Sequence, residues 1–516
     1  MIRSAISIGL LAIAALLPMH AGATEQSDSV RKHTPAVVSS EIGQSVTASD
    51  SSLTVTCIDR RGGRHSGEHY DADIQSPKSA VFSADGKKLY INSLEGGKTV
   101  VYDARTRRKL KVISHRFGKP SAPLWLPSSG YYTFTHYPDG VTRPFMGKPV
   151  EEAMTPDGRW LIVPYYRRTF DINAQDPSAL AVIDTRTDSI VVMAETGPLP
   201  KMVRTSSDGR LLAITHWGDN TVGFMDISDP DPHRWHHLPP ITIGTKLNLN
   251  YSLTSPVNRD SNSGYLLRGT LFLPGDSLLL ISGMAGPVAV IDVKSHQWIG
   301  MIPQLQSVRH IVRSGDMLYM SRNTAGEALS VPLDSVVSAI RSQRHGTRSF
   351  SIGGIRRAKI GSGARTLQPS PSGKYLFVAC NSASALYIVR TSDMKVIASI
   401  PVDSYPVGLD VSADGTLIAV TSQGRDHRGG NAVNFFRVDY AEPEPCLLPL
   451  KADSTAADPL LSATPQPAAA AAENRMALWP LIAGALLLLA AAAAGALVIR
   501  RRPKRYSGRK DDGKGA

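Results

Sequence analysis

A turn-and-strand pattern recurs along this chain and constrains its fold more than any single residue does. Each copy has an Asp-Gly turn or a close variant, a short apolar segment, a polar gap and often Val-Ile-Asp-x-x-Thr. One copy runs from Asp157-Gly158 to Val182-Ile183-Asp184 and Thr187. The turn signals of the copies stand at Asp85-Gly86, Asp157-Gly158, Asp208-Gly209, Gly275-Asp276, Gly315-Asp316, Gly373-Lys374 and Asp414-Gly415. A unit repeated at intervals of roughly 40–50 residues predicts a β-propeller.

The apolar segments have the length and the borders of strands. They are short, as in Leu211-Leu212-Ala213-Ile214, and Gly, Asp, Ser and Asn flank them. A blade of four antiparallel strands cannot cover both of its faces alone, so neighbouring blades must pack on one another. We therefore predict an all-β chain with a β-propeller over residues 50–440, with seven blades favoured and eight as the alternative. Insertions are expected near 247–264 and 334–348, and residues 123–147 form either a degenerate blade or an insertion.

Two stretches carry a family resemblance. Residues 155–203 and 371–420, which include "TPDGRWLIVPYY" and "PSGKYLFVACNSASALYIVRTSDMKVIASIPVDSYPVGLDVSADGTLIAV", resemble the YVTN-type β-propeller repeat of bacterial surface-layer and periplasmic proteins. Some copies depart from the pattern; Arg390, for example, stands where Asp is usual. The resemblance implies the fold but not an activity, because propellers support many unrelated functions.

The two ends of the chain predict export and membrane anchoring. Residues 1–23 have a basic start, an apolar core and a small-residue end, as in a secretory signal peptide. After a leader (24–49) and the propeller, a Pro/Ala-rich linker (441–476) precedes an uncharged segment (477–499) that is long enough to span a bilayer. A basic tail (500–516) follows and should stay in the cytoplasm. We expect a cell-envelope protein with one C-terminal transmembrane helix and the propeller outside the cytoplasm.

Composition argues against several other function classes. The net charge of +13 owes much to the basic tail, so the body is not built for nucleic acid. No nucleophile elbow, zinc-protease motif or P-loop occurs. We therefore predict no catalytic residue, metal or cofactor. Three cysteines are too few for a disulfide scaffold, but Cys57 and Cys446 flank the array and an exported chain can join them.

Basic and aromatic residues recur at one place in the repeat, after the second strand and at the start of the first. These two connections open on the same end of a propeller, where loops carry binding residues. The predicted ligand-binding residues are Tyr165, Arg167, Arg168, Lys201, His216, Trp217, Asp219, Arg268, Arg309, His310, Arg322 and Arg365; Lys78 begins the corresponding strand of the first copy.

Arg forks and aromatic faces suit carboxylates, phosphates and sugars. The sequence thus predicts a membrane-tethered binding or interaction module whose partner is an anionic small molecule, a glycan or an envelope protein. The alternative is an extracytoplasmic hydrolase of the lactonase type that uses the same face.

Overall fold

The computed structural model describes residues 38–342, 348–424 and 429–445. Outside these ranges lie the predicted signal peptide, the uncharged segment 477–499 and the basic tail. Export and membrane anchoring therefore stay predictions. The propeller lies within the first of the two units of the chain, residues 1–456. Within the described ranges, no helix is long and apolar enough to cross a membrane.

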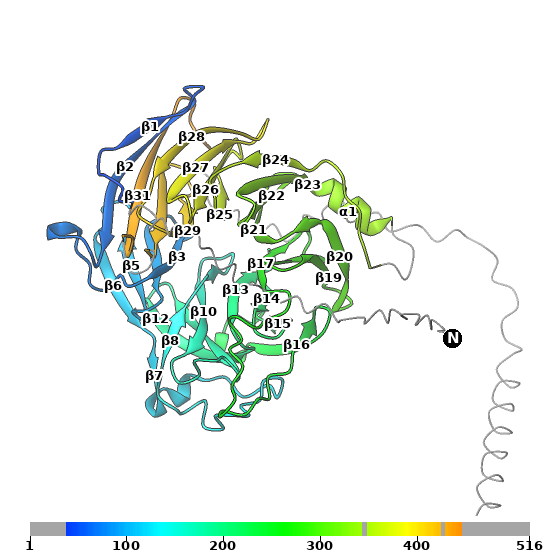
Figure 1. Ribbon diagram of the computed structural model, residues 1–516. Helices are drawn as coiled ribbons and strands as arrows, with labels where there is room; N and C mark the ends of the chain where they lie inside the picture. The colour runs from blue at the N-terminus through cyan, green and yellow to red at the C-terminus, as the bar shows by residue number, and fades with distance from the viewer. Residues whose placement is uncertain (1–37, 343–347, 425–428, 446–516) are drawn as a thin grey trace, which may run out of the picture. The chain divides into compact units, whose positions relative to one another are not determined.

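Seven antiparallel sheets are arranged around a central axis, as Figure 1 shows. In five of them four consecutive strands pair in sequence order, from the innermost outward. These blades comprise β3 (Pro77–Phe82), β4 (Lys88–Ser93), β5 (Lys98–Asp103) and β6 (Lys109–Ser114); β13 (Pro200–Thr205), β14 (Leu211–His216), β15 (Thr221–Asp226) and β16 (His236–Thr242); β17 (Leu267–Phe272), β18 (Leu278–Gly283), β19 (Pro287–Asp292) and β20 (Gln297–Gln306); β21 (Val308–Ser314), β22 (Met317–Arg322), β23 (Glu327–Pro332) and β24 (Arg356–Lys359); and β25 (Ala364–Pro369), β26 (Tyr375–Cys380), β27 (Ala385–Arg390) and β28 (Lys395–Pro401). The preferred count of seven blades is confirmed.

The second blade is irregular. Its strands are β9 (Ala153–Met154), β10 (Trp160–Arg168), β11 (Ser178–Asp184) and β12 (Ser189–Thr196), and the long β10 also pairs with β8 (Phe145–Pro149), which pairs with β7 (Arg116–Phe117). Between β7 and β8 the chain forms the 3-10 helix η2 (Lys119–Leu124) and irregular structure. The stretch 123–147 is therefore an insertion, not a blade.

The last blade joins the two ends of the array. It contains β29 (Pro406–Val411), β30 (Leu417–Ser422) and β31 (Ala432–Tyr440) from the end of the array, followed by β2 (Leu53–Gly62) and β1 (Ser45–Thr47) from its beginning. Leu53 lies opposite Tyr440 in the register. This closure leaves no open seam between the first and last blades, as expected for a ring that would otherwise expose sheet edges. Cys57 is a buried thiol on β2, whereas Cys446 lies outside the described residues, so the bridge stays a prediction.

The blades pack through alternating faces of each strand. On β10, Ile162 belongs to a core cluster with Val203 of the next blade, while Leu161 belongs to a cluster with Tyr90 of the preceding one. Successive side chains of a strand point to opposite faces, so one apolar strand serves both interfaces. The turn glycines of the repeats, such as Gly86 and Gly158, have φ near +70°, a conformation that glycine adopts at little cost.

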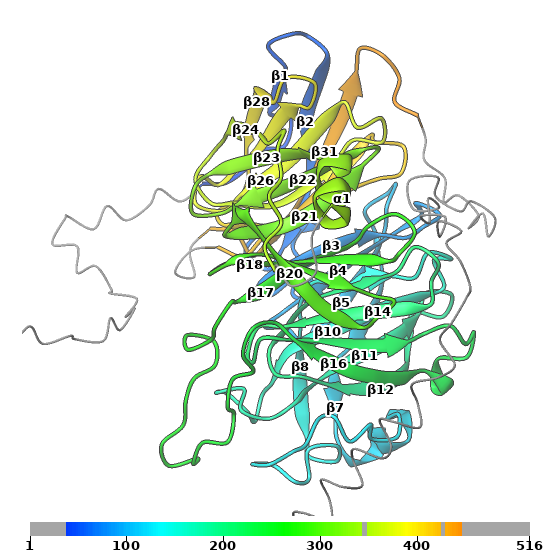
Figure 2. The same ribbon diagram turned by 90° about the vertical axis from the view of Figure 1, so that its right-hand side faces the viewer.

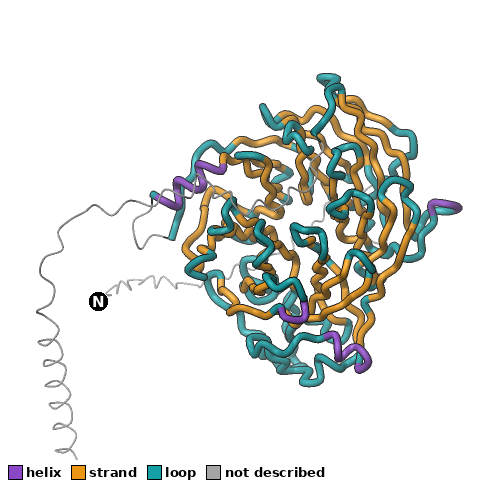
Figure 3. Tube along the Cα trace, turned by 180° about the vertical axis from the view of Figure 1, so that it is seen from behind, coloured by secondary structure: helices purple, strands orange, loops and turns teal. Residues whose placement is uncertain are grey.

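Helices and long insertions lie at the periphery (Figure 3). Within the predicted insertion at 334–348 the chain forms α1 (Leu333–Arg341), and η1 (Gly67–His69) and η3 (Pro232–Arg234) are single turns. The insertion between β16 and β17 extends as a long loop, seen at the left of Figure 2.

Candidate functional site

The innermost strand of six blades begins with the same local distortion. The second residue of the strand is skipped by the pairing with the next strand, as between Pro200 and Met202 or between Val308 and His310. Such a β-bulge re-aims the side chain of the extra residue and often lies beside functional sites. The bulged residues are Lys78, Lys201, Arg268, Arg309, Arg365 and Val407.

A left-handed residue precedes every one of these bulges. Ser76, Leu199, Leu266, Ser307 and Tyr405 all have φ between 49° and 62°, and Gly363 has φ of 80°. A non-glycine residue in this region is strained by about 1 kcal/mol or more. In four of the five blades whose bulged residue is basic, the left-handed residue before it is a strained non-glycine. Five basic side chains thus follow a left-handed residue at the same position of the repeat. We call them the cation ring: Lys78, Lys201, Arg268, Arg309 and Arg365.

The second blade supplies the counter-charge. Glu151 precedes β9 at the corresponding place and forms an ion pair with Arg268. Burial opposes ionisation of Glu151, but the surrounding positive charges, Arg268 foremost, outweigh it and lower its pKa to about 2. These charges reach Glu151 from several blades, so the ring side chains converge on the channel.

Three members of the ring form no ion pair within the described ranges: Lys78, Arg309 and Arg365. Arg309 is 8% exposed, its Nη1 lies 3.7 Å from the sulfur of Met284, and its Nε has no hydrogen-bond partner among the described residues. Arg365 is 5% exposed and its Nε is likewise unsatisfied. Burial, then the charges of neighbouring ring members, lowers the pKa of Arg309 and lowers that of Arg365 to about 10. The arrangement therefore has unused hydrogen-bond donors and excess positive charge.

Polar side chains of neighbouring blades fix the backbone of the ring. The Thr215 hydroxyl donates to the carbonyl of Arg268 at 3.0 Å, and the Ser321 hydroxyl donates to that of Arg365. Each donor lies on the second strand of the preceding blade, so a bond between blades fixes the backbone of Arg268 and of Arg365.

Lys201 lies in an aromatic and acidic cage. Its Nζ is 3.8 Å from the centroid of Tyr166, 4.6 Å from that of Trp217 and 3.4 Å from Oδ1 of Asp260. Arg167 contacts the other oxygen of Asp260 at 3.2 Å. Burial lowers the pKa of Lys201 to about 7, although the charge of Asp260 opposes that effect. Asp260 belongs to the insertion between β16 and β17, so this insertion reaches the mouth of the channel.

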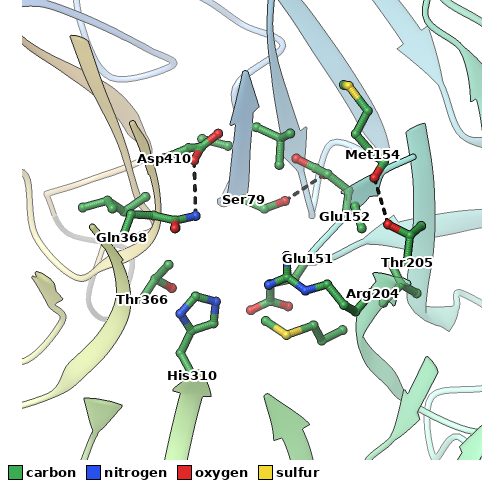
Figure 4. A pocket seen from close by; sticks show the side chains of 17 residues that line it. Ser79, Glu151, Glu152, Met154, Arg204, Thr205, His310, Thr366, Gln368 and Asp410 are labelled. Carbon is green, nitrogen blue, oxygen red and sulfur yellow. Dashed lines mark hydrogen bonds between the residues drawn. The ribbon is translucent and has the colours of Figure 1, made fainter. Parts of the chain in front are cut away.

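A cavity of about 270 Å³ continues the channel beyond the ring. Its lining includes the residues that directly follow the bulged positions, such as Ser79, His310 and Thr366. Figure 4 shows that these side chains converge from several blades. The cavity is also lined by Glu151, Glu152, Met154, Met202, Arg204, Thr205, Gln368 and Asp410.

Two carboxyls in this cavity have raised pKa values. Glu152 is 8% exposed, accepts a hydrogen bond from Ser79 at 2.9 Å, and has an unsatisfied Oε1. Burial raises its pKa well above the usual value. Burial also raises the pKa of Asp410 to about 6, although Phe82 N donates to it at 2.8 Å. The cavity therefore carries less negative charge at a given pH than the number of its carboxyl groups suggests.

The predicted binding residues fall into two groups. The first group consists of Arg268, Arg309 and Arg365, whose charges act on Glu151, of Arg167, Lys201 and Trp217, which lie around Asp260, and of His310, which lines the cavity. The second group, which consists of the other five predicted residues, has hydrogen-bond or ion-pair partners within the fold. Their role in ligand binding stays a prediction.

Four of these others are buried. Tyr165 bonds the ring of His115 at 2.9 Å. Arg168 lies among aromatic rings and donates to Ser178 O at 2.9 Å. His216 lies between Thr196 and Thr221, and burial lowers its pKa to about 3. Asp219 accepts from Thr221.

Arg322 is partly exposed and pairs with Glu327 at 2.9 Å, on the neighbouring strand. Sequence reasoning missed Glu151, Glu152, Arg204, Asp260 and Asp410. The one available signal was position: Glu151 precedes the inner strand of its blade, where five of the other six blades carry Lys or Arg.

Comparison with known proteins finds structural resemblance but identifies no function. No protein-family model and no curated protein sequence matches the chain. Solved structures that resemble it include hydrazine synthase of Kuenenia stuttgartiensis, with 15% sequence identity and a TM-score of 0.47, covering 73% of this chain and 99% of that chain. Another is the Cps50 (Swd1) β-propeller domain of Myceliophteria thermophila, with 12% identity and a TM-score of 0.47, covering 71% and 97%. Likeness at this level says nothing about what this chain binds.

Proposed function

We propose that this protein is a binding module that holds the carboxylate or phosphate of a small ligand on the cation ring. The observation that supports this proposal is that the bulged residues carry more positive charge than the neighbouring carboxylates neutralise. Five basic residues meet at the channel mouth, while Glu151 and Asp260 pair with only two of them. Lys78, Arg309 and Arg365 are left for a ligand.

Physical chemistry favours an anion at this place. A buried charge without a partner is costly, and an unsatisfied donor adds to the cost. An anion that accepts from Arg309 and Arg365 relieves both costs. Arginine suits this role because its planar fork matches carboxylate and phosphate oxygens. Each charge-assisted hydrogen bond contributes about 1.5–3 kcal/mol.

The size of the site limits the ligand. The cavity beyond the ring is about 270 Å³ and is lined by polar and apolar groups in similar measure. A ligand with an acidic group at the ring and a short polar body in the cavity fits this volume better than a macromolecule does.

The test uses the full chain, with succinate and inorganic phosphate as probes in isothermal titration calorimetry. Arg309→Ala should weaken binding about tenfold or more, because losing about 1.4 kcal/mol changes affinity tenfold. Lys87→Ala is the matched control, since Lys87 follows an exposed Asp-Gly turn and its side chain is 80% exposed. Failure of both probes to bind, or equal affinity of the two variants, would refute the proposal.

We further propose that the propeller is exported and held at the membrane by residues 477–499. Sequence supports this topology through the charge-free segment and the basic residues directly after it. A reporter fused after Ala516 should be active in the cytoplasm. Activity of that reporter outside the cytoplasm would contradict the proposed orientation.

A further inference from the structure

Two insertions, neither of which forms blade strands, pack against each other beside blades two and three. The first lies between β7 and β8, and the second between β16 and β17. His136 Nε2 of the first insertion bonds Tyr251 O of the second directly. The β10–β11 connection also binds the second insertion, because Gln175 Nε2 donates to Tyr251 O at 3.0 Å. Arg259 N donates to Asn173 O at 3.1 Å.

Buried polar groups hold the first insertion in one shape. The carboxylate of Asp176 is 2% exposed and accepts from the backbone N–H groups of Thr135, His136 and Tyr137. The carboxylate of Glu195 accepts from the residues just before Tyr131. Networks of this kind rigidify a segment when their members are satisfied.

A buried arginine holds the second insertion. Arg259 is 3% exposed, and its guanidinium donates to the carbonyls of Asn248 and Asn262 within its own loop. The loop is therefore folded around an internal charge. Loops fixed on a rigid scaffold in this way are where binding sites concentrate.

The two insertions and the neighbouring blade connections line a cavity of about 460 Å³. Its volume falls in the range of small-molecule sites. The lining consists of Tyr131, Tyr132, Thr133, Thr135, Gln175, Pro177, Pro198, Asp219, Lys246, Leu247, Asn248, Leu249 and Asn250. Aromatic rings, hydroxyls and amides prevail, with one carboxyl and one ammonium.

Two buried groups in this lining have unused hydrogen-bonding capacity. Gln175 is 2% exposed, and its Oε1 has no partner among the described residues. Asp219 is 3% exposed, and its bonds from Thr221 N and Thr221 Oγ1 both end on Oδ1. A buried acceptor left unpaired costs about 1–3 kcal/mol, so Gln175 Oε1 favours a ligand that donates, and the Asp219 carboxylate can accept from the same ligand.

We propose that this cavity is a second binding site, distinct from the cation ring, and that it takes a neutral sugar. A sugar offers hydroxyls that donate to Gln175 Oε1 and Asp219 and that also accept from the amides of Asn248 and Asn250. Its apolar C–H face can lie on the Tyr131 ring, which is 42% exposed. Asp219 disfavours an anionic ligand, and Lys246 disfavours a cationic one.

The experiment is saturation-transfer NMR on the full chain with three neutral probes: maltose, cellobiose and N,N′-diacetylchitobiose. At least one should receive saturation, most strongly at ring protons, and Tyr131→Ala should weaken its binding about tenfold. The matched control is Tyr70→Ala, since Tyr70 is an exposed tyrosine on another loop. Arg309→Ala should bind the same sugar normally.

Three outcomes overturn the proposal: none of the three probes binds, the sugar binds equally well to Tyr131→Ala, or Arg309→Ala abolishes binding and so places the sugar in the channel. Because the test does not use an anion, its result is independent of the function proposed for the cation ring.

Discussion

Replacing Glu151 by Gln removes the one carboxylate that the second blade places among the ring cations and nearly preserves its shape. In the folded chain the pKa of Glu151 is lowered from 4.5 to about 2. Since each pH unit corresponds to about 1.4 kcal/mol, the ionised carboxylate contributes about 3 kcal/mol to stability at neutral pH. This agrees with the roughly 3–5 kcal/mol lost when one partner of a buried ion pair is removed.

The sign of the pH dependence follows from the lowered pKa. The contribution is fully present above pH 4.5 and disappears as the pH falls through about 2. Glu151→Gln should therefore lower the free energy of unfolding by about 3 kcal/mol at pH 7 and should cost much less near pH 2.

Urea unfolding followed by tryptophan fluorescence measures this loss. Glu95→Gln is the matched control: Glu95 pairs with Lys148 at 2.7 Å but is 51% exposed, so its replacement should cost less than about 1 kcal/mol. Adding phosphate should restore part of the stability of Glu151→Gln, because a ligand that binds only the folded state stabilises it. If Glu151→Gln costs no more than Glu95→Gln, the ring cations do not converge and the reasoning is wrong.

Three further predictions concern other buried charges. Asp410→Asn should stabilise the protein by at most about 3 kcal/mol above pH 6, because the raised pKa of Asp410 makes its ionisation in the folded state costly. Below about pH 4 the substitution should have no effect, and urea unfolding across this pH range measures both. Asp260→Asn should lower the pKa of Lys201 further below about 7, since it removes the carboxylate 3.4 Å from Nζ; NMR titration of ¹³C-methylated lysines would show no change if the two groups are not in contact. Arg168→Ala should speed proteolysis within the β7–β8 insertion while the blades stay intact, because the guanidinium binds Gly140 O and lies 4.6 Å from the Phe134 ring; equal cleavage rates in both proteins would argue against that anchoring role.

The sequence predicted the fold well because its signals are local. An Asp-Gly pair requires a turn glycine with positive φ, and Gly86, Gly158 and Gly209 all have it. The pairing of the chain ends was also predictable, since 53–58 reads as a strand that precedes the first repeat. The number of blades followed from counting turns, and residues 123–147, where the pattern fades, proved to be an insertion.

The site was harder to predict because it depends on the direction of each side chain. Residues 165–168 read as a loop rich in Tyr and Arg, but β10 continues to Arg168, so Tyr165 and Arg168 are buried in packing. The basic residues at strand starts were found because the repeat marks their position. Asp260 was not, since it comes from an insertion whose path no local pattern specifies.

The composition of the last blade has a consequence for the order in which the chain folds. Its inner three strands come from one end of the described chain and its outer two from the other, and Asn434 Nδ2 donates to the Ser40 hydroxyl across 394 positions. Bringing such distant segments together costs loop-closure entropy before their contacts stabilise the chain. Closure of the ring is therefore expected to be slow and to come late in folding. Until β31 has been synthesised and has met β2, the first and last blades each lack a neighbour. A chain of this design therefore needs protection from aggregation from the synthesis of its first strand until the synthesis of its last.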